Sequence, residues 1–318
     1  MTKPDLSTKV GPLVLKNPVM VASGTFGYGE EFSEFYDLSE LGGIMVKGLT
    51  LKPREGNPPH RIAETPCGLL NSIGLQNVGV EAFIEKKMPF LRRFDTRIIT
   101  NITGTTVKEY GEICRRLDGV DGLHAIEVNL SCPNVREGGI QFGTDPKSLG
   151  AVVRETRDAT SLPLFAKLSP NVTDIVSLAR VAKEEGADGV SLINTLLGMA
   201  VDLDNRAPVL SRVVGGLSGP AIKPVALRMV WAVWEELRIP IIGMGGIMSA
   251  RDALEFMLVG ASAIAVGTAN LIRPFASLEV LRGIEEYFRE NDIPSVESFV
   301  GTLRVIPDRD PVLREGST

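Results

Sequence analysis

The chain has 318 residues, of which 44% are hydrophobic and 23% are charged, and its 34 basic and 39 acidic side chains give a formal net charge of −5. A chain of this length and composition buries a sizeable core without disulfide bonds, which excludes the disordered and disulfide-dependent classes. The acidic balance argues against nucleic-acid binding, which draws its affinity from a positive surface.

The amino-terminal segment and the number of cysteines indicate the cellular compartment and the kinds of redox or metal site that the chain can form. The segment MTKPDLSTKVG has no apolar core like that of a signal peptide, and no stretch approaches the roughly 18 apolar residues of a membrane span. We therefore expect a cytoplasmic protein that has no membrane contact. Three cysteines and two histidines are too few for a disulfide framework or a four-thiolate site. We expect no metal site, so redox chemistry here would need an organic cofactor.

Eight short apolar runs alternate with amphipathic stretches along the chain. The runs are apolar at nearly every position, which is typical of parallel strands that are buried on both faces. The predicted strands cover residues 17–24, 42–48, 97–104, 122–132, 162–169, 187–195, 240–246 and 262–270. The predicted helices cover residues 30–41, 78–94, 106–117, 146–160, 174–185, 221–237, 249–259 and 277–290.

Eight strands, each followed by a helix, predict an α/β fold of the TIM type: a (β/α)8 barrel that forms a single domain over residues 1–318. A doubly wound sheet is the alternative, but eight regular units without a mid-chain linker favour closure. Residues 8–17 resemble a short hairpin at the bottom of the barrel. The long connections 49–77 and 196–220 are expected to be inserted loops over the C-terminal face.

Polar side chains gather where the predicted strands end, which is where (β/α)8 barrels place their sites. These ends carry Ser23, Lys47, Asn101, Asn129, Lys167, Asn194, Thr195, the pair Gly245–Gly246, and Gly267 with Thr268. Asparagine is unfavourable in strands, and a lysine inside an apolar strand is costly unless its ammonium has a partner. Each strand lysine therefore has two interpretations: a charge directed at a ligand, or half of a buried ion pair.

The last two strands suggest a phosphate. The segments GMGGI and VGTAN place glycine-rich turns ahead of helices, where barrels commonly bind a phosphate group. Glycine can also simply permit a tight turn, but two adjacent turns of this kind favour a phosphate-bearing ligand. The neutral asparagine amides beside them both donate and accept hydrogen bonds, which favours a polar heterocyclic ligand.

The segment NLSCPN (129–134) contains the cysteine with the strongest functional interpretation. Pro133 ends the strand, so Cys132 is expected at the start of a glycine-rich loop on the site face. Cysteine is more commonly a small buried hydrophobe, and we expect that role for Cys114, which lies on a predicted helix. Cys67 is expected to line a loop, and its role stays open.

Taken together, the motifs NSIGLQN, NLSCPN, INT, GGLSGPAIKP and GMGGI, with the strand lysines, resemble the dihydroorotate dehydrogenases from about residue 19 to about residue 270. Cysteine at position 132 is similar to the soluble class 1 enzymes, whereas class 2 enzymes have serine there and an extra amino-terminal helix. NSIGLQN, GGIQFGTDP and GGLSGPAIKP are similar to the catalytic subunit of class 1B.

The resemblance implies oxidation of (S)-dihydroorotate to orotate in de novo pyrimidine biosynthesis, with FMN accepting the hydride and Cys132 acting as general base. It also implies a partner subunit that carries FAD and a 2Fe–2S cluster and passes electrons to NAD. A heterotetramer of two of each subunit, built on a homodimer of this chain, is the expected assembly. The alternatives are a class 1A-like enzyme that reduces fumarate, and a non-redox lyase or isomerase on a phosphate-binding barrel.

The resemblance also implies two sets of contacts. Those to FMN are Ala22, Ser23, Lys47, Gly48, Asn101, Asn129, Lys167, Ile193, Gly219, Gly245, Gly246, Gly267 and Thr268. Those to the substrate are Lys47, Asn71, Ser72, Ile73, Gly74, Leu75, Asn129, Asn194 and Thr195. The residue types suit these roles, since they combine two lysines with neutral amides and glycine turns.

Overall fold

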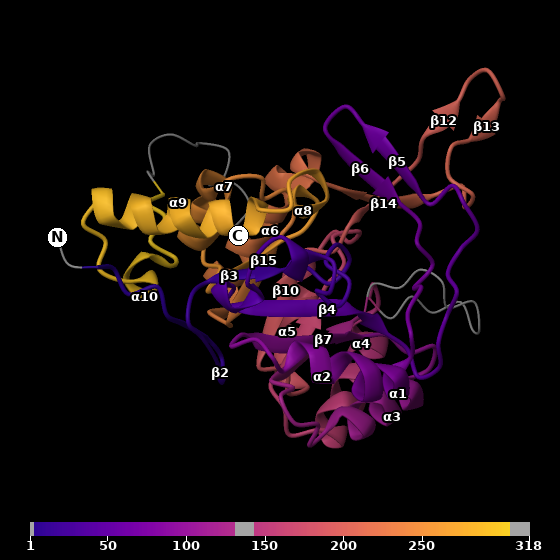
Figure 1. Ribbon diagram of the computed structural model, residues 1–318, viewed down its shortest axis with the longest axis horizontal. Coiled ribbons are helices and arrows are strands. Elements are labelled where there is room, and N and C mark those ends of the chain that lie inside the picture. The colour runs from indigo at the N-terminus through magenta and orange to yellow at the C-terminus, as the bar shows by residue number, and fades with distance from the viewer. Residues whose placement is uncertain (1–2, 131–142, 306–318) are drawn as a thin grey trace, which may run out of the picture.

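The computed structural model describes residues 3–130 and 143–305. Eight parallel strands close into a barrel in the order β10-β15-β16-β3-β4-β7-β8-β9, and helices lie outside it (Figure 1). The strands are β3 (Val19–Val21), β4 (Gly43–Leu49), β7 (Arg97–Ile102), β8 (Ala125–Asn129), β9 (Leu164–Lys167), β10 (Gly189–Leu192), β15 (Ile241–Met244) and β16 (Ala263–Val266). Each lies inside one of the predicted apolar runs except β4, which extends one residue further. The (β/α)8 prediction is confirmed.

Six of the predicted helices form close to their expected bounds, as α3 (Val107–Leu117), α4 (Pro146–Ala159), α5 (Ile175–Glu184), α6 (Lys223–Leu237), α7 (Ala250–Leu258) and α9 (Ala276–Glu290). Side-chain caps explain several starts: Asp174 accepts a hydrogen bond from the backbone of Ser177, and Ser249 from that of Asp252. Two four-residue helices, α8 (Ala269–Ile272) and α10 (Val296–Phe299), were not predicted.

The predicted helix over 30–41 is wrong. Two separate 3-10 turns form instead, η1 (Phe32–Glu34) and η2 (Leu38–Glu40). Between them Asp37 has an extended backbone, and its side chain accepts a 2.9 Å hydrogen bond from the Ser39 backbone. This local bond competes with the backbone hydrogen bonds of a continuous helix, so a separate turn begins after Asp37.

The predicted helix over 78–94 is present but irregular. It consists of α1 (Val80–Ala82), a π-helical turn η3 (Phe83–Lys87) and α2 (Met88–Leu91). Pro89 stands at the start of α2 and has no N–H to donate to the preceding turn. The wider π-helical turn accommodates that lost hydrogen bond within a continuous helical segment.

The barrel interior is closed at the bottom by the amino-terminal hairpin of β1 (Thr8–Val10) and β2 (Leu13–Leu15), as expected. Val10, Leu13 and Leu15 belong to one buried apolar cluster with Met45 and Phe165 of the barrel strands. This cluster fills the lower barrel, so only the upper end is left for polar side chains.

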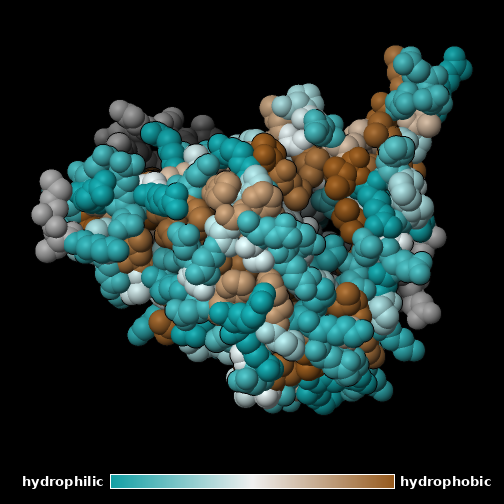
Figure 2. All heavy atoms as spheres, in the orientation of Figure 1, coloured by the Kyte–Doolittle hydropathy of each residue, from teal (hydrophilic) through white to brown (hydrophobic). Residues whose placement is uncertain are grey.

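The two long connections are inserted over the C-terminal face as predicted, and they contain short strands. They supply β5 (Ile62–Thr65), β6 (Gly68–Asn71), β11 (Leu196–Gly198) and β14 (Gly215–Ser218), which form one antiparallel sheet in the order β11-β14-β6-β5. A two-stranded arm, β12 (Val201–Asp202) and β13 (Ala207–Pro208), projects beyond this sheet, and η4 (Pro220–Ile222) leads into α6 (Figure 1). The sheet stands over the carboxyl ends of the barrel strands. Hydrophobic atoms gather beside it and along the base of the arm (Figure 2).

Candidate active site

A cavity of about 950 Å³ lies at the carboxyl ends of the barrel strands. Its volume is in the range of sites for cofactors and small molecules. All eight barrel strands contribute to it at or just beyond their ends, and the antiparallel sheet supplies the opposite wall. The barrel therefore brings residues from every part of the described chain to one place.

All the predicted contacts within the described residues line this cavity. From the strand ends come Ala22, Ser23, Lys47, Gly48, Asn101, Asn129, Lys167, Ile193, Asn194 and Thr195; from the glycine turns and η4 come Gly219, Gly245, Gly246, Gly267 and Thr268; and from β6 and the segment after it come Asn71, Ser72, Ile73, Gly74 and Leu75. Cys132 lies outside the described residues. Which of these residues bind a cofactor, and which a substrate, stays a prediction.

Lys167 combines the two interpretations of a strand lysine. Its side chain is 7% exposed and lines the cavity, while its Nζ lies 3.4 Å from Oε1 of Glu127 and 3.5 Å from Oγ of Ser23. Glu127 is fully buried in the middle of β8. Glu127 was not among the predicted site residues, although a carboxylate inside the apolar run AIEVN was a visible signal.

Lys47 enters the cavity from β4 on the side of the inserted connections. Burial lowers the pKa of Lys47, and the nearby positive charge of Arg61 lowers it further, against the opposing influence of Glu31. A lysine in this setting gains from an anionic ligand, because a negative charge restores the interaction that burial removes.

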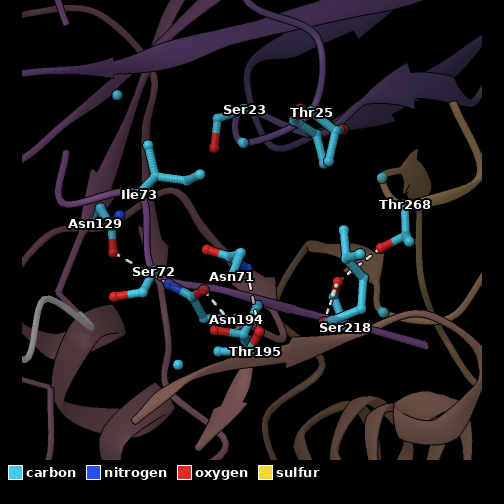
Figure 3. Close-up of a pocket in the computed structure, with 18 of the residues that line it drawn as sticks. Ser23, Thr25, Asn71, Ser72, Ile73, Asn129, Asn194, Thr195, Ser218 and Thr268 are labelled. Atoms are coloured by element: carbon cyan, nitrogen blue, oxygen red, sulfur yellow. Dashed lines mark hydrogen bonds between the residues drawn. The ribbon is translucent and has the colours of Figure 1, made fainter. Parts of the chain in front are cut away.

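Neutral amide side chains also line the cavity, and Asn71, Asn129 and Asn194 are seen together in Figure 3. Asn194 donates to Oδ1 of Asn129 across 3.3 Å and accepts from the Thr195 backbone at 2.8 Å. Asn171 donates to the Thr195 carbonyl at 3.1 Å, and Asn71 donates to the Gly216 carbonyl at 3.2 Å. These bonds fix the amides in place, and such groups can complement a ring of alternating C=O and N–H groups without titrating.

At the glycine turns, the backbone of neighbouring segments packs close to the glycines. Gly245 and Gly246 have φ of +118° and +85°, and a Cβ on Gly246 would lie 2.9 Å from both the Gly219 carbonyl oxygen and the Lys223 nitrogen. Side chains are therefore excluded here, and the turn leaves its backbone close to the cavity. Thr268 donates a 2.8 Å hydrogen bond to Ser218, which links β14 to the last barrel strand (Figure 3).

Further polar residues that were not predicted from the sequence line the cavity. They are Thr25, Arg54, Asn57, Gln76, Thr144, Ser169, Asn171, Ser211, Arg212 and Ser218. Asn57, Arg54 and Arg212 lie in the two long connections, and their place depends on the tertiary sheet rather than on a local pattern. Asn171 lies four residues beyond a strand end, so the same rule that found Lys167 could have found it.

The described residues contain neither a metal-binding cluster nor a membrane-spanning helix. No group of three or more His, Cys, Asp or Glu side chains within residues 3–130 and 143–305 is placed to hold a metal ion. Over the same ranges, no helix has the length and apolar character needed to cross a membrane.

The comparisons with known proteins agree with this geometry. The family model described as dihydroorotate dehydrogenase matches residues 5–288. Over 305 residues the chain is 57% identical to the "Dihydroorotate dehydrogenase B (NAD(+)), catalytic subunit" of Geotalea daltonii, and 56% identical to the protein of that name from Geobacter sulfurreducens; each match covers 96% of this chain and 100% of the relative. The Desulforamulus reducens protein of the same name is 55% identical over 95% of this chain and 100% of its own length. The chain therefore belongs to the dihydroorotate dehydrogenase family.

Proposed function

We propose that this chain is the catalytic subunit of an NAD-linked dihydroorotate dehydrogenase, which oxidises (S)-dihydroorotate to orotate in pyrimidine biosynthesis. One observation carries the proposal. The contacts that the family resemblance implies for two ligands are spread from residue 22 to residue 268, and all of those in the described part of the chain line one cavity. The relatives that share this name match the chain over nearly its whole length.

The cavity fits FMN in three respects. The buried Nδ2 of Asn101 has no hydrogen-bond partner among the described residues, so a ligand acceptor would satisfy it. Glycine turns at the ends of β15 and β16 suit a phosphate, because a glycine has no side chain of its own to cover its backbone N–H. Lys167 supplies a positive charge beside Ser23. When bound, FMN would supply the two-electron acceptor, held by the thirteen residues named above for it.

The chain's own residues would bind the substrate and accept its proton. Lys47 would bind the substrate carboxylate, helped by the backbone of the segment after β6, and the amides of Asn71, Asn129 and Asn194 would hold the pyrimidine ring. Cys132, outside the described residues, would take the proton from C5 while the hydride leaves C6. A thiol suits this task because its ordinary pKa of about 8.5 lies close to the working pH.

We further propose a partner subunit that carries FAD and a 2Fe–2S cluster and delivers the electrons to NAD. Three cysteines in the whole chain are too few for a cluster with four cysteine ligands, which supports placing the cluster on a partner. Two copies of each subunit, arranged around a homodimer of this chain in the cytoplasm, form the proposed assembly.

An anaerobic absorbance titration tests the core of the proposal. The purified chain, reconstituted with FMN, should show a flavin spectrum that bleaches when dihydroorotate is added. A protein that retains no flavin with its partner subunit present would contradict the proposal, as would a flavin that dihydroorotate leaves oxidised. A colourless protein would favour the lyase or isomerase alternative.

A second assay separates the electron acceptors. With dihydroorotate as donor, NAD reduction should require the partner subunit, and fumarate should be a poor acceptor for the chain alone. Efficient fumarate reduction by the isolated chain would instead support the class 1A-like alternative.

A further inference from the structure

Glu127 is a buried carboxylate that the proposed mechanism leaves without a task. None of its surface is exposed, and neither of its oxygens has a hydrogen-bond partner among the described residues. Among the described residues, its ion-pair partner is Lys167, whose Nζ lies 3.4 Å from Oε1. Burying an ion of this kind costs several kcal/mol, so its presence inside a barrel strand needs a reason.

The register of the barrel places Glu127 one layer below the cavity. Alternation along β8 puts it on the same face as Ala125, which belongs to the apolar cluster inside the barrel, and Asn129, which lines the cavity. Lys167 pairs in register with Asn129, and therefore stands one layer higher than Glu127. Glu127 does not line the cavity itself, so any influence on a ligand passes through Lys167.

In the described part of the chain, the other neighbours that hydrogen bonding and strand register give for Lys167 are uncharged. Ser23 contacts its ammonium, and Asn129 on β8 and Ser191 on β10 are its register neighbours. Among the described residues, Glu127 is the one carboxylate within ion-pair distance of Lys167. Lys47 lines the same cavity, and Arg97 donates a hydrogen bond to the Val14 carbonyl.

We propose that Glu127 is a positioning residue that keeps the Lys167 ammonium protonated and fixed at the cavity wall, so that its charge is already present before the flavin is reduced. This inference rests on the proposed function, since it takes FMN to be the ligand beside Lys167. Stability alone does not explain the pair, because buried ion pairs are often replaceable by apolar residues without loss. A fixed positive charge costs no rearrangement when negative charge develops beside it.

Glu127→Gln removes the charge of the partner and keeps its shape. The buried Lys167 would then favour its neutral form, and reduction of the flavin would draw one extra proton onto it. Each pH unit would therefore change the reduction equilibrium by a further factor of ten, which is about 30 mV for a two-electron couple.

The test measures the flavin midpoint potential from pH 6 to 9 in the holoenzyme. The native chain and Glu127→Asp, which keeps the charge, should share one slope, and Glu127→Gln should be steeper by up to about 30 mV per pH unit. In Glu127→Gln/Lys167→Met the additional slope should vanish, because the titrating group is gone. If Glu127→Gln has the native slope and the native potential, the proposal is overturned.

A second measurement, made without flavin, tests the role of Glu127 independently of the proposed function. In the unfolded chain a lysine stays protonated to about pH 10, so a folded state that releases this proton earlier gains stability as pH rises. The urea unfolding free energy of flavin-stripped Glu127→Gln should therefore increase from pH 7 to 9 relative to that of the stripped native protein. Parallel pH profiles would overturn the inference, whereas a native chain that never binds flavin would overturn the proposed function alone.

Discussion

The three cysteines differ in environment, which allows the proposed base to be tested against internal controls. Cys114 is buried, and desolvation raises the pKa of its thiol to about 12, so it is no candidate for a base near neutral pH. Cys67 is exposed, at the edge of the antiparallel sheet between β5 and β6. Cys132 lies outside the described residues, and its role depends on the motif around it.

Cys132→Ala should retain FMN and lower the rate of flavin reduction by dihydroorotate by about a hundredfold or more, because the C5 proton then has no acceptor. Stopped-flow absorbance measures this rate, and Cys67→Ser is the matched control that should leave it unchanged. In the native protein the rate should rise with pH toward the thiol pKa of about 8.5. A rate for Cys132→Ala within a few-fold of the native value would exclude the thiolate base.

The environment of Lys47 predicts that orotate binding depends on pH. Because burial lowers its pKa, its ammonium is lost at a lower pH than that of a free lysine, and the attraction for the orotate carboxylate is lost with it. Orotate affinity should therefore be highest at pH 6 to 7 and fall as pH rises through this lowered pKa, by roughly tenfold to a hundredfold in all.

The control for this prediction is Lys47→Met. The dissociation constant of orotate can be followed by the perturbation of the flavin spectrum. In this variant it should already be high at pH 6, and it should lack the pH dependence that comes from Lys47. Any pH dependence that remains in the variant belongs to orotate or to other groups. Equal profiles for the native protein and the variant would remove Lys47 from the binding role.

At the scale of elements, glycines with positive φ differ in how much a larger side chain would destabilise the fold. Gly260 ends α7 with φ +118°, and a Cβ there would lie 2.1 Å from Trp234 of α6. Gly119, after α3, has φ +75° and no neighbouring atom within 4 Å of such a Cβ. The first position combines backbone strain with helix–helix packing, and the second isolates the strain.

Gly119→Ala should lower the urea unfolding free energy by about 1 kcal/mol, the usual cost of a left-handed residue. Gly260→Ala should lower it by about 2 kcal/mol more, since Trp234 must move. Equal effects would show that the contact with Trp234 relaxes freely and that packing at the end of α7 is not tight.

The elements that sequence reasoning located best are those in which local pattern and tertiary packing agree. The apolar runs of β3, β9 and β15 are buried on both faces, so composition alone identifies them. The segments over 30–41 and 78–94 deviate from regular helix because single residues, Asp37 and Pro89, change the local hydrogen bonding. Such effects depend on one side chain and leave the periodicity intact.

At the scale of the whole molecule, the barrel rule predicted most of the cavity, because every parallel strand delivers its carboxyl end to the same face. What the rule could not supply were contacts between distant segments. The pairing of β6 with β14 joins residues such as Leu70 and Leu217, and no local pattern encodes it. Glu127 stands in the middle of β8 rather than at its end, so the rule did not select it, although a carboxylate in an apolar run was a local signal.

The mixed origin of the antiparallel sheet constrains how this enzyme can be modified. Because β5 and β6 come from one connection and β11 and β14 from another, neither half completes its hydrogen-bond ladder without the other. Shortening one connection, or transplanting it alone from a relative, would leave an unpaired edge above the site. The two insertions therefore form one exchangeable module, and a chimera should carry both or neither.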